Sequence, residues 1–96
     1  MTKVTKKLVR EMVQGEPYEY YPLGKYIVAA PGICGGRPTF KHTRIEVQVV
    51  FDLLAAGEPI EQLIENLQGR VSRKAVMETL RLATALLKRE AEAVAA

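Results

Sequence analysis

The fold is decided by residues 46–88, EVQVVFDLLAAGEPIEQLIENLQGRVSRKAVMETLRLATALLK, in which apolar side chains recur at helical spacing. Two segments, 46–56 and 59–67, each place four apolar residues at i, i+3, i+4 and i+7, which is one face of an α-helix. Gly57 would end the first helix, and Pro59 suits the first position of the second. The spacing therefore predicts two short amphipathic helices.

A third and longer helix is predicted over residues 72–92. Ser72 is a good N-cap, because its hydroxyl can accept a hydrogen bond from a backbone N–H of the first turn. One face of this helix is apolar and carries Val76, Leu80, Ala83 and Leu87. Leu82 and Leu86 widen the apolar surface beyond what a small monomer needs to cover. A wide apolar helix near a chain terminus indicates burial against a second copy, so we expect a homodimer.

The N-terminal quarter, residues 1–25, is expected to be a basic helix or arm followed by a tyrosine-rich connector. Near-helical spacing of apolar residues over 1–14 favours a surface helix, which Gly15 and Pro17 would end. Residues 26–96 would then form the remaining, mainly helical domain.

That domain is predicted to begin with a short β-hairpin over residues 26–45, since two β-prone runs flank a cluster of turn residues. Gly35 and Gly36 would supply positive φ angles, and Pro38 would fix the direction of the exit. The Lys-Ser/Thr pair of a P-loop does not follow these glycines, so they serve backbone geometry.

Composition restricts the classes of function. The 96 residues are 48% hydrophobic and 26% charged, as in one globular domain, and no apolar run approaches the roughly 18 residues that span a bilayer. The net charge of +3 permits contact with nucleic acid without requiring it. Cys34 and His42 are the only cysteine and histidine, too few for a four-ligand zinc site, and no metal or cofactor is expected. A single thiol agrees with a cytoplasmic protein.

The second and third predicted helices, joined by a glycine-containing turn, are typical of a helix-turn-helix, whose second helix reads the major groove of DNA. The residues expected at the DNA are Arg70, Arg73, Lys74, Met77 and Arg81. Glu78 would be repelled by phosphate unless it reads a cytosine amino group. The turn is about one residue longer than the compact form, and Glu65 packs less easily than a small apolar residue. A three-helix core with a solvated charged stripe is the competing interpretation.

Catalysis has weaker support in the sequence. Cys34 and His42 could form a thiolate–imidazole pair across the hairpin, but no oxyanion donors or orienting carboxylate are evident nearby. We expect Cys34 to behave as a small apolar residue and His42 as a partly exposed turn residue. The sequence therefore predicts no enzyme.

Two motifs resemble those of a known family: ICGGRP at residues 33–38 and TRIEV at residues 43–47. They are similar to the Pro-x-Ile-Cys-Gly-Gly-Arg/Lys-Pro turn and the Gly-Thr-Arg-Ile-Pro-Val segment of the bacterial domain of unknown function four-three-three, often described as antitoxin-like. The resemblance covers about residues 26–87.

This resemblance implies a homeodomain-like, winged-helix-related domain of three helices after the short β-hairpin. It also implies an antitoxin that binds a nuclease-like toxin of the PIN type and represses its own operon at operator DNA. A homodimeric protein-interaction module that does not bind DNA is the alternative.

The motif residues expected to hold the structure are Gly35, Gly36, Arg37, Pro38, Thr43 and Arg44. Arg37 and Arg44 would hydrogen-bond loop carbonyls and lock the hairpin onto the first helix, although contact with DNA phosphate or a toxin carboxylate is the competing role. We expect Arg44→Ala to lower thermal stability more than binding.

The sequence departs from the family pattern at two positions. His42 stands where the family has glycine, so a histidine would occupy a backbone position that favours positive φ. Glu46 replaces the usual proline and puts an acid at the favourable end of the helix dipole.

Overall fold

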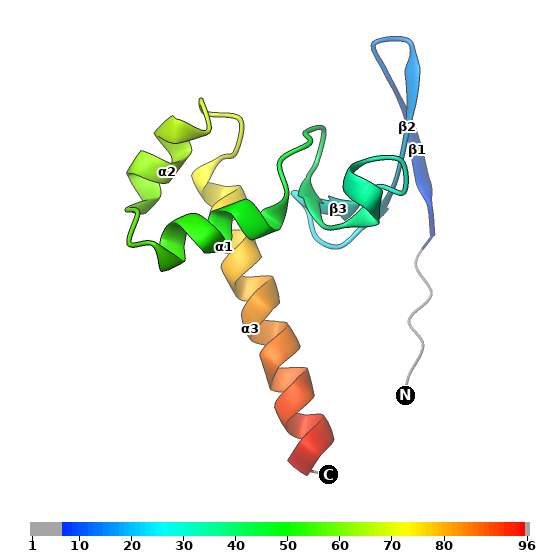
Figure 1. Cartoon of the computed structure of the whole chain (residues 1–96). Coiled ribbons are helices and arrows are strands. Elements are labelled where there is room, and N and C mark those ends of the chain that lie inside the picture. The colour runs from blue at the N-terminus through cyan, green and yellow to red at the C-terminus, as the bar shows by residue number, and fades with distance from the viewer. Residues whose placement is uncertain (1–6, 96) are drawn as a thin grey trace.

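The computed structural model describes residues 7–95, in which a sheet is followed by helices (Figure 1). The strands are β1 (Val9–Val13), β2 (Glu16–Pro22), β3 (Ile27–Ala29) and β4 (Thr39–Phe40). A short 3-10 turn, Cys34–Gly36, lies between β3 and β4. The helices are α1 (Val47–Ala55), α2 (Ile60–Asn66) and α3 (Arg73–Ala95).

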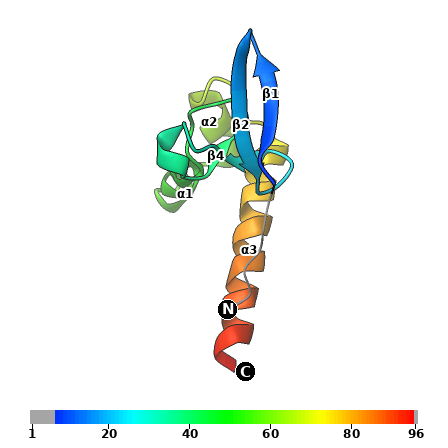
Figure 2. The ribbon, with the colours of Figure 1, turned by 90° about the vertical axis from the view of Figure 1, so that its right-hand side faces the viewer.

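The N-terminal part of the chain corrects the expected fold class. The four strands form one antiparallel sheet in the order β1-β2-β3-β4, and β1 and β2 make a long hairpin whose turn points away from the C-terminal end of α3 (Figure 2). The expectation of a mainly α, homeodomain-like domain with only a short β-hairpin is therefore wrong. So is the expected surface helix, because its described residues form β1; residues 1–6 of it lie outside the described residues.

The segment forms a strand because its side chains alternate between a more buried and an exposed face, and this alternation outweighs the weak helical spacing. Val9, Glu11 and Val13 point to the more buried face of β1, and the residues between them are exposed. Gln14 and Gly15, with φ angles of 52° and 79°, form the two-residue turn between the paired residues Val13 and Glu16. Two positive φ angles match the twist of a hairpin. Gly15 is thus a hairpin turn rather than a helix end.

The predicted β3–β4 hairpin is confirmed. Ile27 pairs with Phe40 and Val28 with Thr39. Gly35 and Gly36 have positive φ angles of 63° and 82°, as their glycine identity predicts.

The three helices lie where the spacing predicts them. Gly57 ends α1 with a φ of 89°, and its N–H donates to the Leu54 carbonyl at 3.0 Å. Ser72 caps α3, because its hydroxyl accepts from the Ala75 N–H at 3.1 Å. α3 continues three residues beyond the predicted end, to Ala95.

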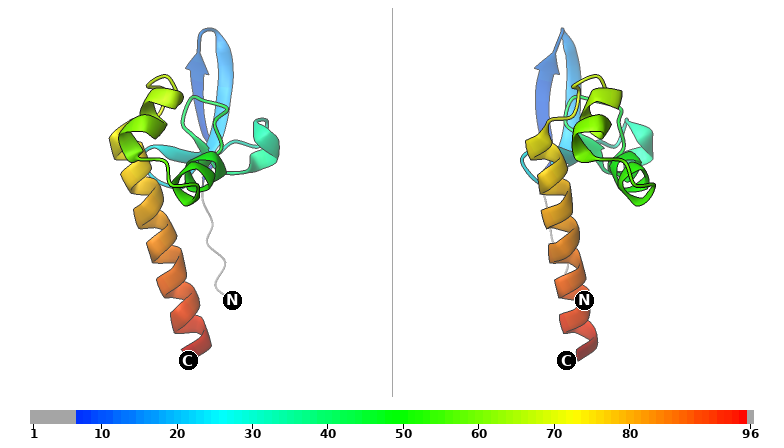
Figure 3. Two further views of the ribbon diagram at one scale, coloured as in Figure 1. Left: turned by 60° about the vertical axis from the view of Figure 1, so that its left-hand side comes forward. Right: turned by 90° about the vertical axis from the view of Figure 1, so that its left-hand side faces the viewer.

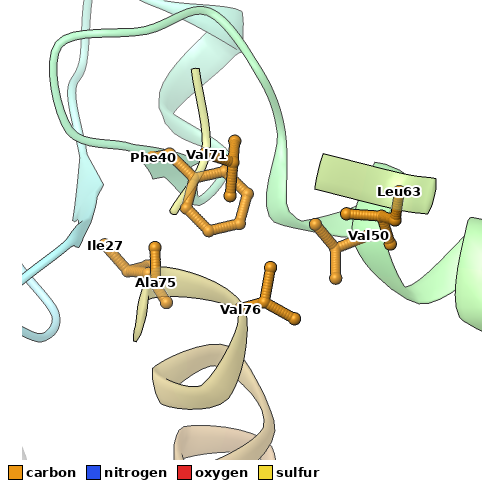
Figure 4. Packing of buried hydrophobic residues seen from close by; sticks show 7 residues of the cluster. All are labelled: Ile27, Phe40, Val50, Leu63, Val71, Ala75 and Val76. Carbon is orange, nitrogen blue, oxygen red and sulfur yellow. The ribbon is translucent and has the colours of Figure 1, made fainter. Parts of the chain in front are cut away.

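One core joins the sheet to the helices (Figure 4). Its buried members come from β3, β4, all three helices and the turn before α3: Ile27, Phe40, Val50, Leu63, Val71, Ala75 and Val76. Burying one such branched side chain stabilises the fold by about 1.5–3 kcal/mol. A second cluster of Tyr20, Val28 and Ala30 attaches the β1–β2 hairpin to the domain.

The second half of α3 leaves the domain. Figure 3 shows this half extending beyond the other elements, so that the molecule measures 47 × 35 × 20 Å. Leu86, Leu87 and Val94 are 51%, 69% and 84% exposed. Among residues 7–95, no helix combines the length and the apolar character needed to cross a membrane.

Candidate nucleic-acid interface

A row of basic side chains follows one side of α3. Lys74, Arg81 and Lys88 are seven residues apart, which places them on the same side of a helix at intervals of about 10 Å along its axis. All three are exposed. We call these three residues, together with Lys25, the basic row.

Lys25 reaches this side of α3 from the turn between β2 and β3. Together with Tyr26 it lines a hollow of about 530 Å³ against the N-terminal half of α3. The helix contributes Arg73, Lys74, Met77, Glu78 and Arg81 to the same hollow. Four of the five residues predicted to face DNA are therefore brought together.

Within this hollow, the Glu78 carboxylate is bound by backbone amides. Its carboxylate oxygens accept hydrogen bonds from the backbone N–H groups of Lys25 at 2.9 Å and Tyr26 at 2.8 Å. Gly24 makes room for this contact, since a β-carbon there would lie 2.6 Å from the carboxylate. Glu78 is also the only acid between Arg73 and Arg89. Glu78 thus has a structural role, since its carboxylate holds the backbone of the β2–β3 turn.

The basic row carries unneutralised charge. Across residues 7–95, no carboxylate lies within 4 Å of the charged nitrogens of Lys25, Lys74, Arg81 or Lys88. Arg73 differs, because its guanidinium forms an ion pair with Glu61 of α2. The row therefore presents a local positive surface, and Arg73 adds less to it than the sequence predicts.

Arg70 lies in a different place from the other predicted DNA residues. It lines a hollow of about 290 Å³ with Val13, Tyr18, His42 and Arg44, between the β1–β2 hairpin and the α2–α3 turn. Two residues of the basic row, Lys25 and Lys88, were not among the residues that the sequence predicted to face DNA. The seven-residue spacing from Lys74 and Arg81 leads to Lys88, whereas only tertiary structure brings Lys25 there.

Arg37 ties the β3–β4 connection to the start of α1, but its partner is an acid rather than a carbonyl. Its Nε and a terminal nitrogen donate to the two carboxylate oxygens of Glu46, at 2.7 and 3.3 Å. Through this ion pair Arg37 lowers the pKa of the Glu46 carboxyl, and Glu46 raises the pKa of Arg37. Glu46, the residue that departs from the family pattern, is thus the partner that fixes this turn.

Arg44 does not hold the hairpin with its side chain. No described residue hydrogen-bonds its guanidinium, and only its backbone carbonyl is engaged, by the Cys34 thiol at 3.4 Å. The neighbouring Thr43 performs the structural task, since its hydroxyl donates to the Phe40 carbonyl at 2.8 Å and accepts from the Ile45 N–H at 3.0 Å. The predicted stability loss in Arg44→Ala was based on hydrogen bonds from its guanidinium to loop carbonyls, and these hydrogen bonds are not present among the described residues.

Cys34 and His42 turn to separate partners, so no thiolate–imidazole pair is formed. The His42 ring contacts Glu11 at 2.9 Å, and its backbone, at a φ of 64°, donates to the Tyr18 hydroxyl at 3.0 Å. Hydrogen bonds from Tyr20 above all, then from His42 and Lys41, lower the pKa of Glu11 from 4.5 to about 2. No group of three or more histidine, cysteine or acidic side chains within residues 7–95 is arranged to hold a metal ion.

An apolar groove lies on another side of α3. It has a volume of about 520 Å³, and its walls are α1 and the middle of α3. Val47 and Phe51 line one wall, Leu82 and Leu86 line the other, and Leu23 lies between β2 and β3 at the base. Positions 82 and 86 of a helix point away from positions 74, 81 and 88, so the groove and the basic row face different directions.

Comparison with known proteins gives one match. The sequence model of a family described as "protein of unknown function (DUF433)" matches residues 27–83, from the start of β3 to the middle of α3. No curated protein and no solved structure matches the chain.

Proposed function

The chain belongs to the DUF433 family, and from that premise we propose that it is an antitoxin-like DNA-binding protein that contacts DNA phosphates through its basic row. One observation carries this proposal. Lys25, Lys74 and Arg81 line one hollow, and Lys88 continues the same side of α3 beside Arg81. None of the four has an acidic partner among the described residues, and Glu78 is bound by backbone amides. Phosphate contacts of this kind supply most of the affinity of a protein for DNA.

The start of α3 also suits contact with DNA. It follows α2 through the turn of residues 67–72, and Val71, Ala75 and Val76 anchor this end of the helix in the core. A firmly held helix whose N-terminal side chains are exposed is the arrangement that helix-turn-helix proteins use in the major groove. Met77 would then lie nearest the base edges, and Lys74, Arg81 and Lys88 nearest the phosphates.

We assign the binding of protein partners to the apolar groove. A cytoplasmic antitoxin would pair with a second copy and with a PIN-type toxin, and an apolar groove beside exposed leucines is suited to such contacts. Because the groove and the basic row face different directions, one molecule could hold both partners at once.

The test is fluorescence anisotropy with DNA from upstream of the gene and with unrelated DNA, over a salt series. Tight binding to the upstream DNA with a steep salt dependence supports a repressor. The double variant Lys74→Gln/Arg81→Gln should weaken binding at least about tenfold and lower the salt slope by about 2, since each lost phosphate contact removes about 0.9.

Arg10→Gln is the matched control. It removes one positive charge from β1, where Arg10 is 65% exposed and lies only 3.9 Å from Glu19. It should leave the affinity and the salt slope unchanged. Equal, salt-sensitive binding to both DNAs that the double variant does not weaken would disprove the proposal.

The apolar groove favours a second candidate, a homodimeric interaction module that does not bind DNA. The two candidates differ in what covers α3. The module predicts that Leu86→Ser abolishes complex formation while Lys74→Gln/Arg81→Gln has no effect on any measured activity.

A further inference from the structure

We propose that the hollow between the β1–β2 hairpin and the α2–α3 turn binds a phosphate group, held by Arg44 and Arg70. Segments far apart in the sequence form its walls: the hairpin, the connection between β4 and α1, and the turn before α3. Its volume of about 290 Å³ admits a phosphate and part of the molecule that carries it. This site is separate from the basic row and does not rest on the function proposed above.

The backbone that carries Arg70 is fixed. Its N–H donates to the Leu67 carbonyl at 3.0 Å, within the turn that ends α2. The next residue, Val71, is 1% exposed and belongs to the core. Arg70 therefore extends from a defined position, so a ligand would not have to order the backbone that carries it.

Arg44 is held in the same way from the other side of the hollow. The Cys34 thiol donates to its carbonyl at 3.4 Å, and the Thr43 hydroxyl bridges the backbone on either side of it. Ile45, directly after Arg44, packs against the core. Arg44 and Arg70 thus line one hollow, and each extends from a connecting segment whose backbone is held by hydrogen bonds.

The charge of the hollow is not cancelled locally. Neither Arg44 nor Arg70 has a carboxylate within 4 Å in the part of the chain that the structure describes. The acid beside the hollow, Glu11, is already bound by the Tyr20 hydroxyl, by Lys41 at 3.3 Å and by the His42 ring at 2.9 Å. An anion that enters would therefore meet two free guanidinium groups.

The residues of the hollow select phosphate among anions. Two guanidinium forks offer up to four parallel N–H donors, which match the tetrahedral oxygens of a phosphate better than one carboxylate. The rings of Tyr18 and His42, 5.0 Å apart, form a rigid aromatic wall beside them. Free phosphate, a nucleoside monophosphate and the end of a nucleic-acid strand share this chemistry, and a stacked base would favour the nucleotide sources.

The experiment is an NMR titration of the ¹⁵N-labelled full chain at constant ionic strength. The probes are inorganic phosphate, adenosine 5′-monophosphate and, as a probe without phosphate, adenosine. Saturable shifts of the Arg44 and Arg70 side-chain N–H signals with both phosphate probes, and not with adenosine, are expected. Tighter binding of the monophosphate than of inorganic phosphate would assign the source as a nucleotide, and equal binding would assign it as phosphate itself.

The variants Arg44→Gln and Arg70→Gln should each weaken binding about tenfold, the effect of one lost charge-assisted interaction, whereas Arg10→Gln should not change it. Unchanged binding in both arginine variants, or shifts confined to the basic row, would overturn the proposal. Lys74→Gln/Arg81→Gln separates the two functions, because it should abolish tight binding of duplex DNA and leave the shifts at Arg44 and Arg70 intact.

Discussion

One apolar face runs through both halves of α3, from Val76 through Leu80 and Ala83 to Leu87, but the two halves have different surroundings. In the first half, Ala75, Val76 and Thr79 are buried, and Leu82 packs against the core. In the second half, from Thr84 to Ala95, every side chain is exposed. The apolar residues of the first half pack in the core, whereas those of the second half lie outside it.

This difference shows that helical periodicity identifies an apolar face without identifying what covers it. β3, α1 and α2 lie around the first half, whereas the C-terminal end of α3 extends beyond the other elements (Figures 1 and 3). Exposed leucines on a rigid, protruding helix are costly to leave in water, which favours a partner.

The largest effect is expected from aspartate substitutions in the two halves. Val76→Asp puts an unpaired charge at a position with 0% exposure, and should destabilise the fold by about 4 kcal/mol or more, enough to unfold a small domain. Leu87→Asp, on a side chain 69% exposed, should change the free energy of unfolding of the monomer by no more than about 0.5 kcal/mol. Urea denaturation followed by circular dichroism measures both, and similar losses would contradict the division of α3.

Self-association tests the free half directly. Sedimentation velocity at several concentrations should show a dimer for the native chain and a monomer for Leu86→Ser/Leu87→Ser, because these side chains form the exposed apolar surface. The control Lys88→Gln changes a neighbouring residue outside the apolar face and should remain dimeric. A native chain that stays monomeric at all concentrations would contradict the homodimer and would indicate that a different protein binds the second half of α3.

Glu78 helps to attach the first half of α3 to the turn between β2 and β3. Glu78→Ala leaves the N–H groups of Lys25 and Tyr26 without their acceptor and should cost about 1–2 kcal/mol in thermal or urea unfolding. Glu78→Gln keeps an acceptor oxygen and should recover about half of that loss. The Gln variant should also bind DNA a few times more tightly, since it removes a negative charge beside Lys74 and Arg81. Equal stability of the two variants would show that the carboxylate does not hold the β2–β3 turn.

The β1–β2 hairpin supplies a test that does not involve α3. The pKa of Glu11 is about 2 in the folded chain and 4.5 ordinarily, so its contribution to stability is complete above pH 4.5 and is lost as the pH falls toward 2. Glu11→Gln should lower the Tm at pH 7 by roughly a few degrees, and the difference from the native chain should vanish near pH 2. A difference that stays constant between pH 7 and pH 2 would show that ionised Glu11 is not the cause.

The smallest effect is expected in the turn that leads into α3. Gln68 has a φ of 57°, in the left-handed region that glycine adopts without strain. Gln68→Gly should therefore raise the stability of the fold by about 0.5 kcal/mol, measured by thermal unfolding. Gln62→Gly, inside α2, should lower it by about 0.5–1 kcal/mol. A loss in both variants would mean that the side chain of Gln68 matters more than its backbone.

The helices, their caps and the β3–β4 turn could be predicted because local chemistry decides them. Gly57, Ser72 and the pair Gly35-Gly36 act within a few residues of their own position, and each behaves as its residue type predicts. β1 could have been found from the alternation of Val9, Glu11 and Val13, but the weak helical spacing of neighbouring residues competed with it. Pairing with β2 stabilises a strand in this segment, and the β-propensity of the individual residues does not include this contribution.

The site could be predicted only in part. Seven-residue spacing places Lys74, Arg81 and Lys88 together, but whether their charge is free depends on which acids the fold brings near. Arg73 meets Glu61, and Glu78 meets backbone amides more than fifty residues earlier in the chain. Neither contact has a local signal in the sequence.

The sequence by itself therefore determined three helices, their ends, the β3–β4 hairpin and membership of the DUF433 family, because each depends on short-range backbone chemistry or a contiguous motif. Tertiary structure alone decided that the N-terminal part is a sheet, that Arg44 and Arg70 share a hollow, and that half of α3 stands free. These features arise from contacts between distant segments, whose energy is gained only once the chain has folded.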